Sequence, residues 1–440
     1  MPLARHRRTC RVCGSPRLRP VVDLGRQCLQ GAFLKPGHPA PPDRRWPLRL
    51  LRCEAEGGGC GLLQLGVSVA PELLYADYWY RSGTNATMRG HLAGIAAEAL
   101  ALCPDDSPSV LDIGCNDGTL LSCFPRGSRR VGVDPSAAAG AGEGGVLLRG
   151  SFPSEPVLAA LPEGGFDVVT TIAMFYDLED PCAAAAAIAA CLKPGGVWIL
   201  EVSYLPLMLL RNAFDTICFE HLEYYSLRVL ETVAARAGLR VFRAALNDIN
   251  GGSLRCYLCH AGADDKGGPE DAAFLEALRR REAAMGLDRD APYLEFQARC
   301  EALRDGLFAR LRAIRAAGGT VHVYGASTKG NVLLQWCGIG PGLVDCAADR
   351  NPEKAGATTL GSGIPIVSEE TSRALRPDWY LVLPWHFRQE FLERERRTVE
   401  AGTKLLFPLP AIEVVDAAGL EAAMAGPPGP EALLGLAAPA

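Results

Sequence analysis

The sequence lacks long apolar runs, an apolar N-terminal leader and an excess of positive charge. No segment reaches the roughly 18 uninterrupted apolar residues that a membrane-spanning helix needs, so we expect no membrane partner. The basic residues 1–8 lead into Cys10-Arg11-Val12-Cys13 rather than into an apolar segment, which argues against a secretory signal peptide. A formal net charge of −5 argues against nucleic acid as a partner, because phosphate binding normally needs clustered positive charge.

Cysteine, in contrast, is plentiful. The chain has 16 cysteines, and without a leader we expect them to be thiols in a reducing compartment, which favours the cytoplasm. Its 440 residues exceed the usual length of one compact domain, so two or three domains are expected. Hydrophobic residues make up 48% of the chain and charged residues 22%, which indicates globular rather than disordered domains.

Strand-like and helix-like segments alternate in two blocks, which is typical of parallel sheets with crossover helices. The first block has a helical pattern over 87–104 and expected strands at 110–113, 130–133, 166–172 and 197–202. The second block follows a charged helical stretch over about 270–317 and has expected strands at 320–325, 343–347, 364–367 and 379–383. The fold class is therefore α/β. We expect a Cys-rich module (8–70), a first α/β domain (71–260), a smaller second α/β domain (261–412) and a flexible Ala/Gly/Pro-rich tail (413–440).

Four cysteines of the N-terminal module have the chemistry of a zinc site. Cys10 and Cys13 form one tight knuckle, and Cys53 and Cys60 supply a second pair of thiolates for tetrahedral coordination. Six residues separate the second pair, but three glycines among them allow the loop to fold back. Four thiolates leave no open position, so the expected role is structural. The alternatives are four unrelated thiols or a redox Cys-x-x-Cys motif.

The most specific motif is a strand that runs into a glycine-containing turn, Val110-Leu111-Asp112-Ile113-Gly114-Cys115-Asn116-Asp117-Gly118. Gly114 and Gly118 allow close approach of the backbone to a ligand. The Gly-x-x-x-Gly spacing, with Asp112 two residues before it, differs from the G-x-G-x-x-G of dinucleotide-binding folds. Asp134, at the end of the next strand, lies about 20 residues downstream, where a carboxylate holds ribose hydroxyls in such folds.

The turn resembles the first motif of class I methyltransferases, which implies a Rossmann-like core and S-adenosylmethionine as cofactor. The resemblance implies that Asp112 lies near the methionine amino group and that Gly114, Asn116 and Gly118 border the cofactor. Ser151 and Phe152 match the position that flanks the adenine, and Ala173 and Met174 match the edge of the sulfonium pocket. Lys193-Pro194-Gly195-Gly196-Val197, before the next strand, completes the ordered pattern.

A histidine between carboxylates is the candidate reacting group. His221 lies in Phe219-Glu220-His221-Leu222-Glu223-Tyr224-Tyr225, after the fifth strand of the first block. An imidazole of near-neutral pKa can accept a proton from carbon or oxygen, and an adjacent carboxylate can orient it. The alternative is a histidine that only packs beside the helix expected to begin at Ser226.

The order of zinc module, methyltransferase core, Glu-His-Leu-x-Tyr-Tyr-Ser segment and second α/β domain resembles the nucleotide-sugar C-methyltransferases over residues 8–412. Further matching segments are 78–83, 247–253, 324–331 and 383–387. The resemblance implies C-3 methylation of a nucleotide diphosphate keto-deoxysugar through an enolate. It implies His221 as the base, Glu220 beside it and Tyr80 as a hydroxyl that faces the sugar. The substrate residues that it implies are Tyr224, Tyr324, Gly325, Lys329 and Asn331, the last four at a strand-to-helix turn suited to pyrophosphate.

Three departures from the family's pattern concern the substrate. Phe219 replaces the first histidine of a frequent His-Glu-His, Cys218 replaces a tyrosine of some sugar enzymes, and Phe175-Tyr176-Asp177 replaces a histidine after the fourth strand. O-methylation of a sugar or small natural product and a non-catalytic, cofactor-binding scaffold are the alternative functions. The sequence leaves open the nucleotide, the sugar, the methylated atom and the oligomeric state.

Overall fold

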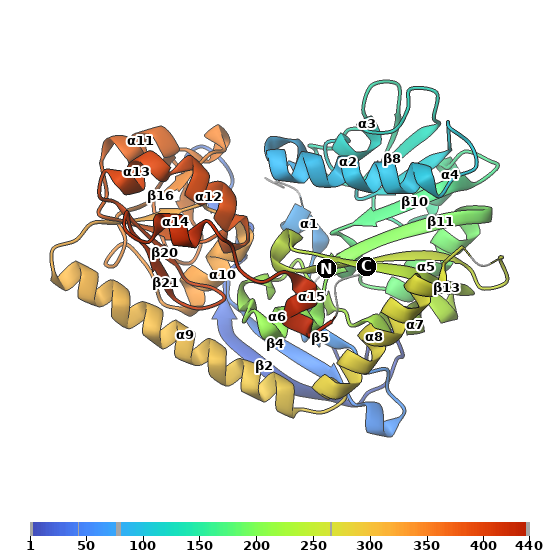
Figure 1. Ribbon diagram of the computed structural model, residues 1–440, viewed down its shortest axis with the longest axis horizontal. Helices are drawn as coiled ribbons and strands as arrows, with labels where there is room; N and C mark the ends of the chain where they lie inside the picture. Colours follow the sequence, from blue (N-terminus) through green and yellow to red (C-terminus); the bar gives the residue numbers. More distant parts are fainter. Residues whose placement is uncertain (1–2, 43, 76–80, 265, 437–440) are drawn as a thin grey trace.

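The computed structural model describes residues 3–42, 44–75, 81–264 and 266–436. Two α/β domains lie side by side, and the N-terminal sheet lies beneath both of them (Figure 1). Over these described residues, no helix is long and apolar enough to cross a membrane. The described residues include all 16 cysteines, and none of them forms a disulfide.

The N-terminal module is built on an antiparallel sheet in the order β12-β5-β4-β2. Its strands are β2 (Leu18–Gln27), β4 (Trp46–Cys53), β5 (Leu63–Leu65) and β12 (Glu223–Tyr224), while β1 (Ala4–His6) pairs with β6 (Val67–Val69). The strand β12 belongs to the segment that carries His221, and it pairs with β5. The short β3 (Phe33–Leu34) pairs with β17 (Thr358–Thr359) of the C-terminal domain. The module therefore contacts both α/β domains through backbone hydrogen bonds.

The first α/β domain has a seven-stranded sheet in the order β13-β14-β11-β10-β7-β8-β9. The strands are β7 (Val110–Ile113), β8 (Arg130–Asp134), β9 (Val146–Arg149), β10 (Phe166–Ile172), β11 (Leu192–Ser203), β13 (Leu239–Asn247) and β14 (Ser253–His260). Strands β7 to β11 are parallel, and β13 and β14 add an antiparallel edge. The helices are α1 (Pro71–Tyr75), α2 (Ala86–Ala101), α3 (Thr119–Ser122), α4 (Glu155–Ala160), α5 (Pro181–Cys191), α6 (Leu205–Leu210) and α7 (Leu227–Arg236). The predicted strands 110–113 and 166–172 are confirmed at these bounds.

The charged helical stretch predicted over 270–317 forms two helices rather than one. They are α8 (Pro269–Met285) and α9 (Ala291–Ala316). The long α9 leads from the first α/β domain to the second and lies along the N-terminal sheet (Figure 1).

The second α/β domain has a six-stranded sheet in the order β18-β16-β15-β19-β20-β21. The strands are β15 (Val321–Tyr324), β16 (Cys346–Asp349), β18 (Ile366–Ser368), β19 (Trp379–Val382), β20 (Lys404–Phe407) and the antiparallel β21 (Glu413–Val415). The helices are α10 (Thr328–Trp336), α11 (Glu369–Ala374), α12 (Arg388–Arg394) and α13 (Arg396–Glu400). From β15 the chain adds β16 and β18 on one side of the sheet and then β19 and β20 on the other, so the strand order reverses between β15 and β19. The carboxyl ends of these two strands flank a crevice of the kind that binds ligands in open α/β sheets.

Residues 413–436 differ from the flexible tail that composition predicted. They form β21, α14 (Leu420–Ala423) and α15 (Pro430–Leu434). Leu420 is 2% exposed and Leu434 is 1% exposed, and α15 packs against α6 of the first α/β domain (Figure 1). Burial of these leucines outweighs the weak local propensity of the Ala/Gly/Pro-rich segment.

Candidate functional site

Four cysteine sulfurs form the predicted metal cluster in the N-terminal module. The Sγ atoms of Cys10, Cys13, Cys53 and Cys60 all lie within 4.8 Å of one another. The Cys10–Cys60 and Cys13–Cys53 pairs are each 3.5 Å apart. Tetrahedral zinc with thiolate bonds of standard length requires sulfurs about 3.8 Å apart, so this donor set fits zinc. Hydrogen bonds among these thiols lower the pKa of Cys53 and raise the pKa of Cys10 and Cys60, because the neighbouring groups share their protons.

The wide spacing of the second cysteine pair is explained by its loop. A short 3-10 helix, Ala55–Gly57, turns the chain back after Cys53. A Cβ atom at Gly59 would lie 2.5 Å from the Cys53 sulfur and 2.5 Å from the backbone oxygen of Glu54. Only glycine fits there without displacing a metal ligand, as the folded-back loop predicted.

The turn after β7 is fixed by hydrogen bonds to β8. Gly114, with a φ of +76°, donates its N–H to the Val133 carbonyl at 2.7 Å. The Asn116 N–H donates to Oδ2 of Asp134 at 2.9 Å, and the Ser136 N–H donates to Oδ1 of the same carboxylate at 2.8 Å. The Asp134 carboxylate is therefore held in one orientation at the carboxyl end of β8.

Asp112 is buried at the end of β7. The Thr170 hydroxyl of β10 donates a hydrogen bond of 2.7 Å to its Oδ1. Burial raises the pKa of Asp112 to about 7, because the charged carboxylate is removed from water. A cationic group of a ligand beside it would restore the charged form.

Most of the predicted site residues surround one cavity. It has a volume of about 1250 Å³ and lies between the two α/β domains and the N-terminal module. Of the predicted residues, it is lined by Asp112, Gly114, Asn116, Asp134, Ser151, Phe152, Ala173, Met174, Glu220, His221, Tyr324, Gly325 and Lys329. This volume exceeds that of a usual single-ligand site, so two ligands can be held together. The predicted hydroxyl of Tyr80 lies outside the described residues.

Three predicted contacts do not line this cavity. A Cβ atom at Gly118 would lie 2.7 Å from the backbone nitrogen of Gly142, so this glycine serves close backbone packing. Tyr224 lies in β12 and is buried in the hydrophobic core. Asn331 is completely buried, and its Nδ2 donates to the Gln30 carbonyl at 2.6 Å, so it joins α10 to the N-terminal module.

His221 has the hydrogen-bond arrangement of a neutral base. Its Nδ1 lies 2.7 Å from the Thr216 carbonyl oxygen, which can only accept, so Nδ1 carries the proton and Nε2 keeps a lone pair. The Tyr176 ring packs edge-on against the imidazole at 4.5 Å between centroids. Burial, together with the positive charge of Lys329, lowers the pKa of His221 to about 3. The imidazole is therefore neutral at physiological pH.

Two carboxyl groups line the cavity with His221, one predicted and one not. Glu220 Oε2 and Asp177 Oδ1 are both buried and have no hydrogen-bond partner among the described residues. Burial raises the pKa of both carboxyl groups. The departures Cys218 and Phe219, in contrast, are completely buried in the hydrophobic core, where Phe219 packs edge-on against Trp46. Their side chains thus do not reach a ligand in the cavity.

The C-terminal domain supplies the opposite wall. Lys329 of α10 donates from Nζ to the Asn250 carbonyl at 2.8 Å, and burial lowers its pKa. The Tyr324 hydroxyl points away from the cavity, donating to Glu395 at 2.7 Å and accepting from Arg373 at 2.7 Å. The predicted role of Tyr324 in substrate binding is therefore limited to its ring and backbone.

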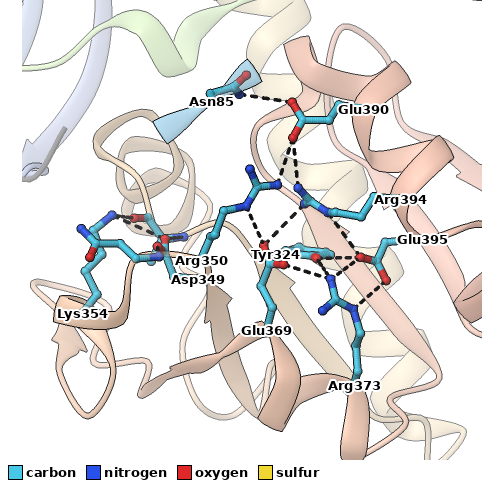
Figure 2. A network of polar contacts seen from close by, with 12 residues as sticks. Asn85, Tyr324, Asp349, Arg350, Lys354, Glu369, Arg373, Glu390, Arg394 and Glu395 are labelled. Atoms are coloured by element: carbon cyan, nitrogen blue, oxygen red, sulfur yellow. Dashed lines mark hydrogen bonds and ion pairs between the residues drawn. The ribbon is translucent and has the colours of Figure 1, made fainter. Parts of the chain in front are cut away.

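An unpredicted network of ion pairs extends along this wall (Figure 2). Arg350 and Arg394 both donate to Glu390 Oε1, at 2.9 and 3.1 Å. Glu390 Oε2 accepts from Nδ2 of Asn85, the residue that caps α2 of the first α/β domain. The network therefore joins the two α/β domains beside the cavity. Sequence reasoning missed it because its members come from distant segments.

Comparisons with known proteins match three consecutive parts of the chain. Family models match it as a zinc-binding domain over residues 10–75, a methyltransferase domain over 85–244 and a C-methyltransferase C-terminal domain over 248–410. The C-methyltransferase NovU of Streptomyces niveus is 32% identical over 416 residues, which are 93% of this chain and 97% of NovU.

Other matches are partial. The ubiquinone biosynthesis O-methyltransferase of Albidiferax ferrireducens is 35% identical over 106 residues, which cover 22% of this chain and 42% of that enzyme. Among solved structures, the amino pentose methyltransferase CalS10 of Micromonospora echinaspora is 19% identical with a TM-score of 0.29 and covers 42% of this chain and 99% of its own.

Proposed function

Because the chain belongs to the C-methyltransferase family and is an S-adenosylmethionine-dependent methyltransferase with a Rossmann-like core, we propose that it methylates carbon 3 of a nucleotide-linked keto-deoxysugar. The observation that carries this proposal is the neutral His221, with its free Nε2 lone pair, in the cavity that the cofactor turn also lines. A carbon acid must lose a proton before it can be methylated, so a base in the same cavity is required.

The cofactor half of the proposal rests on the β7–β8 side of the cavity. The bound cofactor supplies an electrophilic methyl group on a positively charged sulfur. In this proposal Asp112 accepts hydrogen bonds from an ammonium group, and the Asp134 carboxylate, which two backbone N–H groups hold, accepts them from ribose hydroxyls. Ser151 and Phe152 border the adenine in this proposal, and Ala173 and Met174 border the sulfonium.

The chemical half rests on His221 and Glu220. His221 Nε2 accepts the proton from the carbon next to the keto group, and the Thr216 carbonyl stabilises the resulting imidazolium through Nδ1–H. Burial raises the pKa of Glu220, which favours its protonated form, and in that form the carboxyl group would donate a hydrogen bond to the keto oxygen as negative charge develops there. The enolate carbon would then form a bond to the cofactor's methyl group as the methyl–sulfur bond breaks, and the electron pair of that bond would stay on sulfur to give a neutral thioether.

The proposed nucleotide site is the crevice of the second α/β domain. The N-terminus of α10 faces the cavity with Ser327, Thr328 and Lys329. Backbone N–H groups at a helix start and a lysine favour a diphosphate. Gly325 and Lys329 are therefore the proposed contacts of the substrate's pyrophosphate.

The test is solvent deuterium exchange without methyl transfer. The protein is incubated in D₂O with S-adenosylhomocysteine and a panel of nucleotide-linked 4-keto-deoxysugars, and exchange at carbon 3 is followed by NMR. We expect exchange with the wild-type protein and its loss in His221→Ala, with cofactor affinity nearly unchanged. The matched control is His38→Ala, because His38 is exposed in a loop outside the cavity.

The alternatives give different outcomes. Methylation of oxygen, with no exchange at carbon, would indicate an O-methyltransferase. Binding of S-adenosylmethionine without turnover of any substrate, unaffected by His221→Ala, would indicate a scaffold. Either result would overturn the proposal.

A further inference from the structure

Arg11 lies between two zinc ligands, yet its side chain is completely buried. Its Nη1 donates to the Leu65 carbonyl at 2.8 Å and to Gln64 Oε1 at 3.2 Å. Its Nη2 donates to the Ser68 hydroxyl at 2.8 Å. A buried guanidinium is unfavourable unless it is paired, so these hydrogen bonds hold the Arg11 side chain in one place.

The guanidinium also faces two carboxylates of the first α/β domain. Nε lies 3.4 Å from Glu223 Oε1, and Nη2 lies 3.6 Å from Glu179 Oε2. Glu223 is completely buried, and neither of its carboxyl oxygens has a hydrogen-bond partner among the described residues. Among the described residues, Arg11 is the cation within ion-pair distance of this carboxyl group, and Glu223 is two residues from His221.

Strand β5 transmits the position of Arg11 to the base. The Leu65 N–H donates to the Leu222 carbonyl at 2.8 Å, and Gln64 pairs with Glu223 in the β5–β12 ladder. On the other side, the Leu222 N–H donates to the Tyr176 carbonyl at 2.7 Å, and the Tyr176 ring packs on His221. The two residues that follow His221 are thus bound to the strand that Arg11 holds, and the first of them is also bound to Tyr176, whose ring packs on His221.

We propose that Arg11 is a positioning residue, which couples the zinc knuckle to the segment of His221 so that metal loading controls the base rather than cofactor binding. The Cys10-x-x-Cys13 knuckle fixes the backbone of Arg11, and Arg11 fixes β5 and Glu223. The zinc module acts on the reaction from outside the cavity. This inference rests on the proposed role of His221.

The first test separates position from stability. In Arg11→Met the buried Glu223 loses its cation, which can unfold the module, so the double variant Arg11→Met/Glu223→Gln is measured as well. Glu223→Gln removes the unpaired charge. We expect kcat about 100-fold lower in both variants, with zinc content, cofactor affinity and substrate KM within threefold of wild type. Recovery of kcat together with thermal stability in the double variant would assign Arg11 to packing alone and overturn the proposal.

The second test does not depend on activity. Protein labelled with ¹⁵N-histidine, with the signal of His221 assigned from His221→Ala, reports the Nδ1–H bond to Thr216 directly. Arg11→Met/Glu223→Gln and zinc removal by a chelator should both shift the His221 signal, while that of the distant His322 stays in place. The control is Arg49→Met, because Arg49 forms an exposed ion pair with Asp23 in the same sheet.

An unchanged His221 signal in the folded double variant or in the zinc-free protein would overturn the coupling. Failure of the proposed function is a separate result, since it would appear as turnover retained by His221→Ala. The NMR shift tests the coupling in either case.

Discussion

The turns that follow β7 and β15 repeat one geometry in the two α/β domains. In each, a glycine with positive φ, Gly114 or Gly325, donates its N–H to the neighbouring strand, at 2.7 and 2.8 Å. In each, an aspartate at the end of that strand accepts a backbone N–H of the turn, from Asn116 to Asp134 at 2.9 Å and from Ala326 to Asp349 at 2.8 Å. Both turns line the same cavity from opposite sides.

The two turns differ in charge. Lys354 lies with its Nζ 3.4 Å from Asp349 and donates to the Ala326 carbonyl at 2.6 Å, and Lys329 lies at the start of α10. Over the described residues, Asp134 forms no ion pair. The first turn therefore presents carboxyl groups that form no ion pair among the described residues, which suits an ammonium and ribose hydroxyls, whereas the second presents lysines, which suit an anion. The difference supports a division of the cavity between cofactor and nucleotide.

Substitution of the turn glycines should have the largest effect on this division. A Cβ atom at Gly114 would lie 2.6 Å from Met174, in a backbone conformation that costs alanine about 1–3 kcal/mol. We expect Gly114→Ala to weaken S-adenosylmethionine binding about 100-fold by calorimetry. Gly325→Ala, with its Cβ 2.5 Å from Pro384, should instead raise the substrate KM.

Gly90→Ala is the matched control for both glycines, because no atom lies within 4 Å of the added Cβ in α2. Equal loss of cofactor binding in Gly114→Ala and Gly325→Ala would contradict the division of the cavity.

The two aspartates offer the next comparison. Asp134→Ala removes the acceptor of two backbone N–H groups and the proposed ribose contact, each worth about 1–2 kcal/mol. We expect cofactor binding to fall about 30-fold, with substrate KM little changed. In Asp349→Ala the same calorimetric titration should give wild-type cofactor affinity. Unchanged cofactor affinity in Asp134→Ala would undo its assignment.

The sequence predicted the first turn better than the second, for a physical reason. Asp112, Gly114 and Asp134 come together through the pairing of the consecutive strands β7 and β8, so their spacing along the chain carries the geometry. The four cysteines of the zinc site could be predicted for another reason, because only cysteine side chains offer thiolate ligands to a metal. The strand bounds 110–113 and 166–172 also follow from short apolar runs limited by turn residues.

Positions set by distant segments could not be predicted in this way. Tyr224 is buried because β12 pairs with β5, and Asn331 is buried because α10 packs on the N-terminal module. Local composition also did not predict the helices and strand of residues 413–436, since these depend on burial of Val415 and Leu420 in one core and of Leu434 in another. The sequence did not identify Asp177 as a site residue, because only the folded cavity brings it together with Glu220 and His221.

The variant Lys329→Met tests whether the positive charge of the second turn binds the substrate's diphosphate. Its ammonium is completely buried and would face a diphosphate at the start of α10. We expect Lys329→Met to raise the KM for the nucleotide sugar about tenfold, the effect of roughly 1.4 kcal/mol, without changing cofactor affinity. Lys404→Met is the control, since Lys404 lies at the amino end of β20, away from the cavity. A loss of cofactor affinity in Lys329→Met would place the cofactor across both turns.

The smallest expected effect is the pH dependence of the first turn. The pKa of Asp112 is raised to about 7, so its carboxylate forms as the pH rises through neutrality. A cationic amino group binds the carboxylate and not the neutral acid. Cofactor affinity should therefore fall about threefold from pH 7.5 to 6.5, which is the change in the charged fraction of a group with this pKa.

Calorimetry in buffers of different ionisation enthalpy measures whether cofactor binding releases or takes up protons. Binding at pH 6.5 should release protons from the wild-type protein and not from Asp112→Asn. Nucleotide-sugar binding to the second turn should show no such release, since Lys354 already accompanies Asp349. Proton release that persists in Asp112→Asn would move the titrating group elsewhere in the cavity, to Glu220 or Asp177, and would remove Asp112 from the cofactor's amino group.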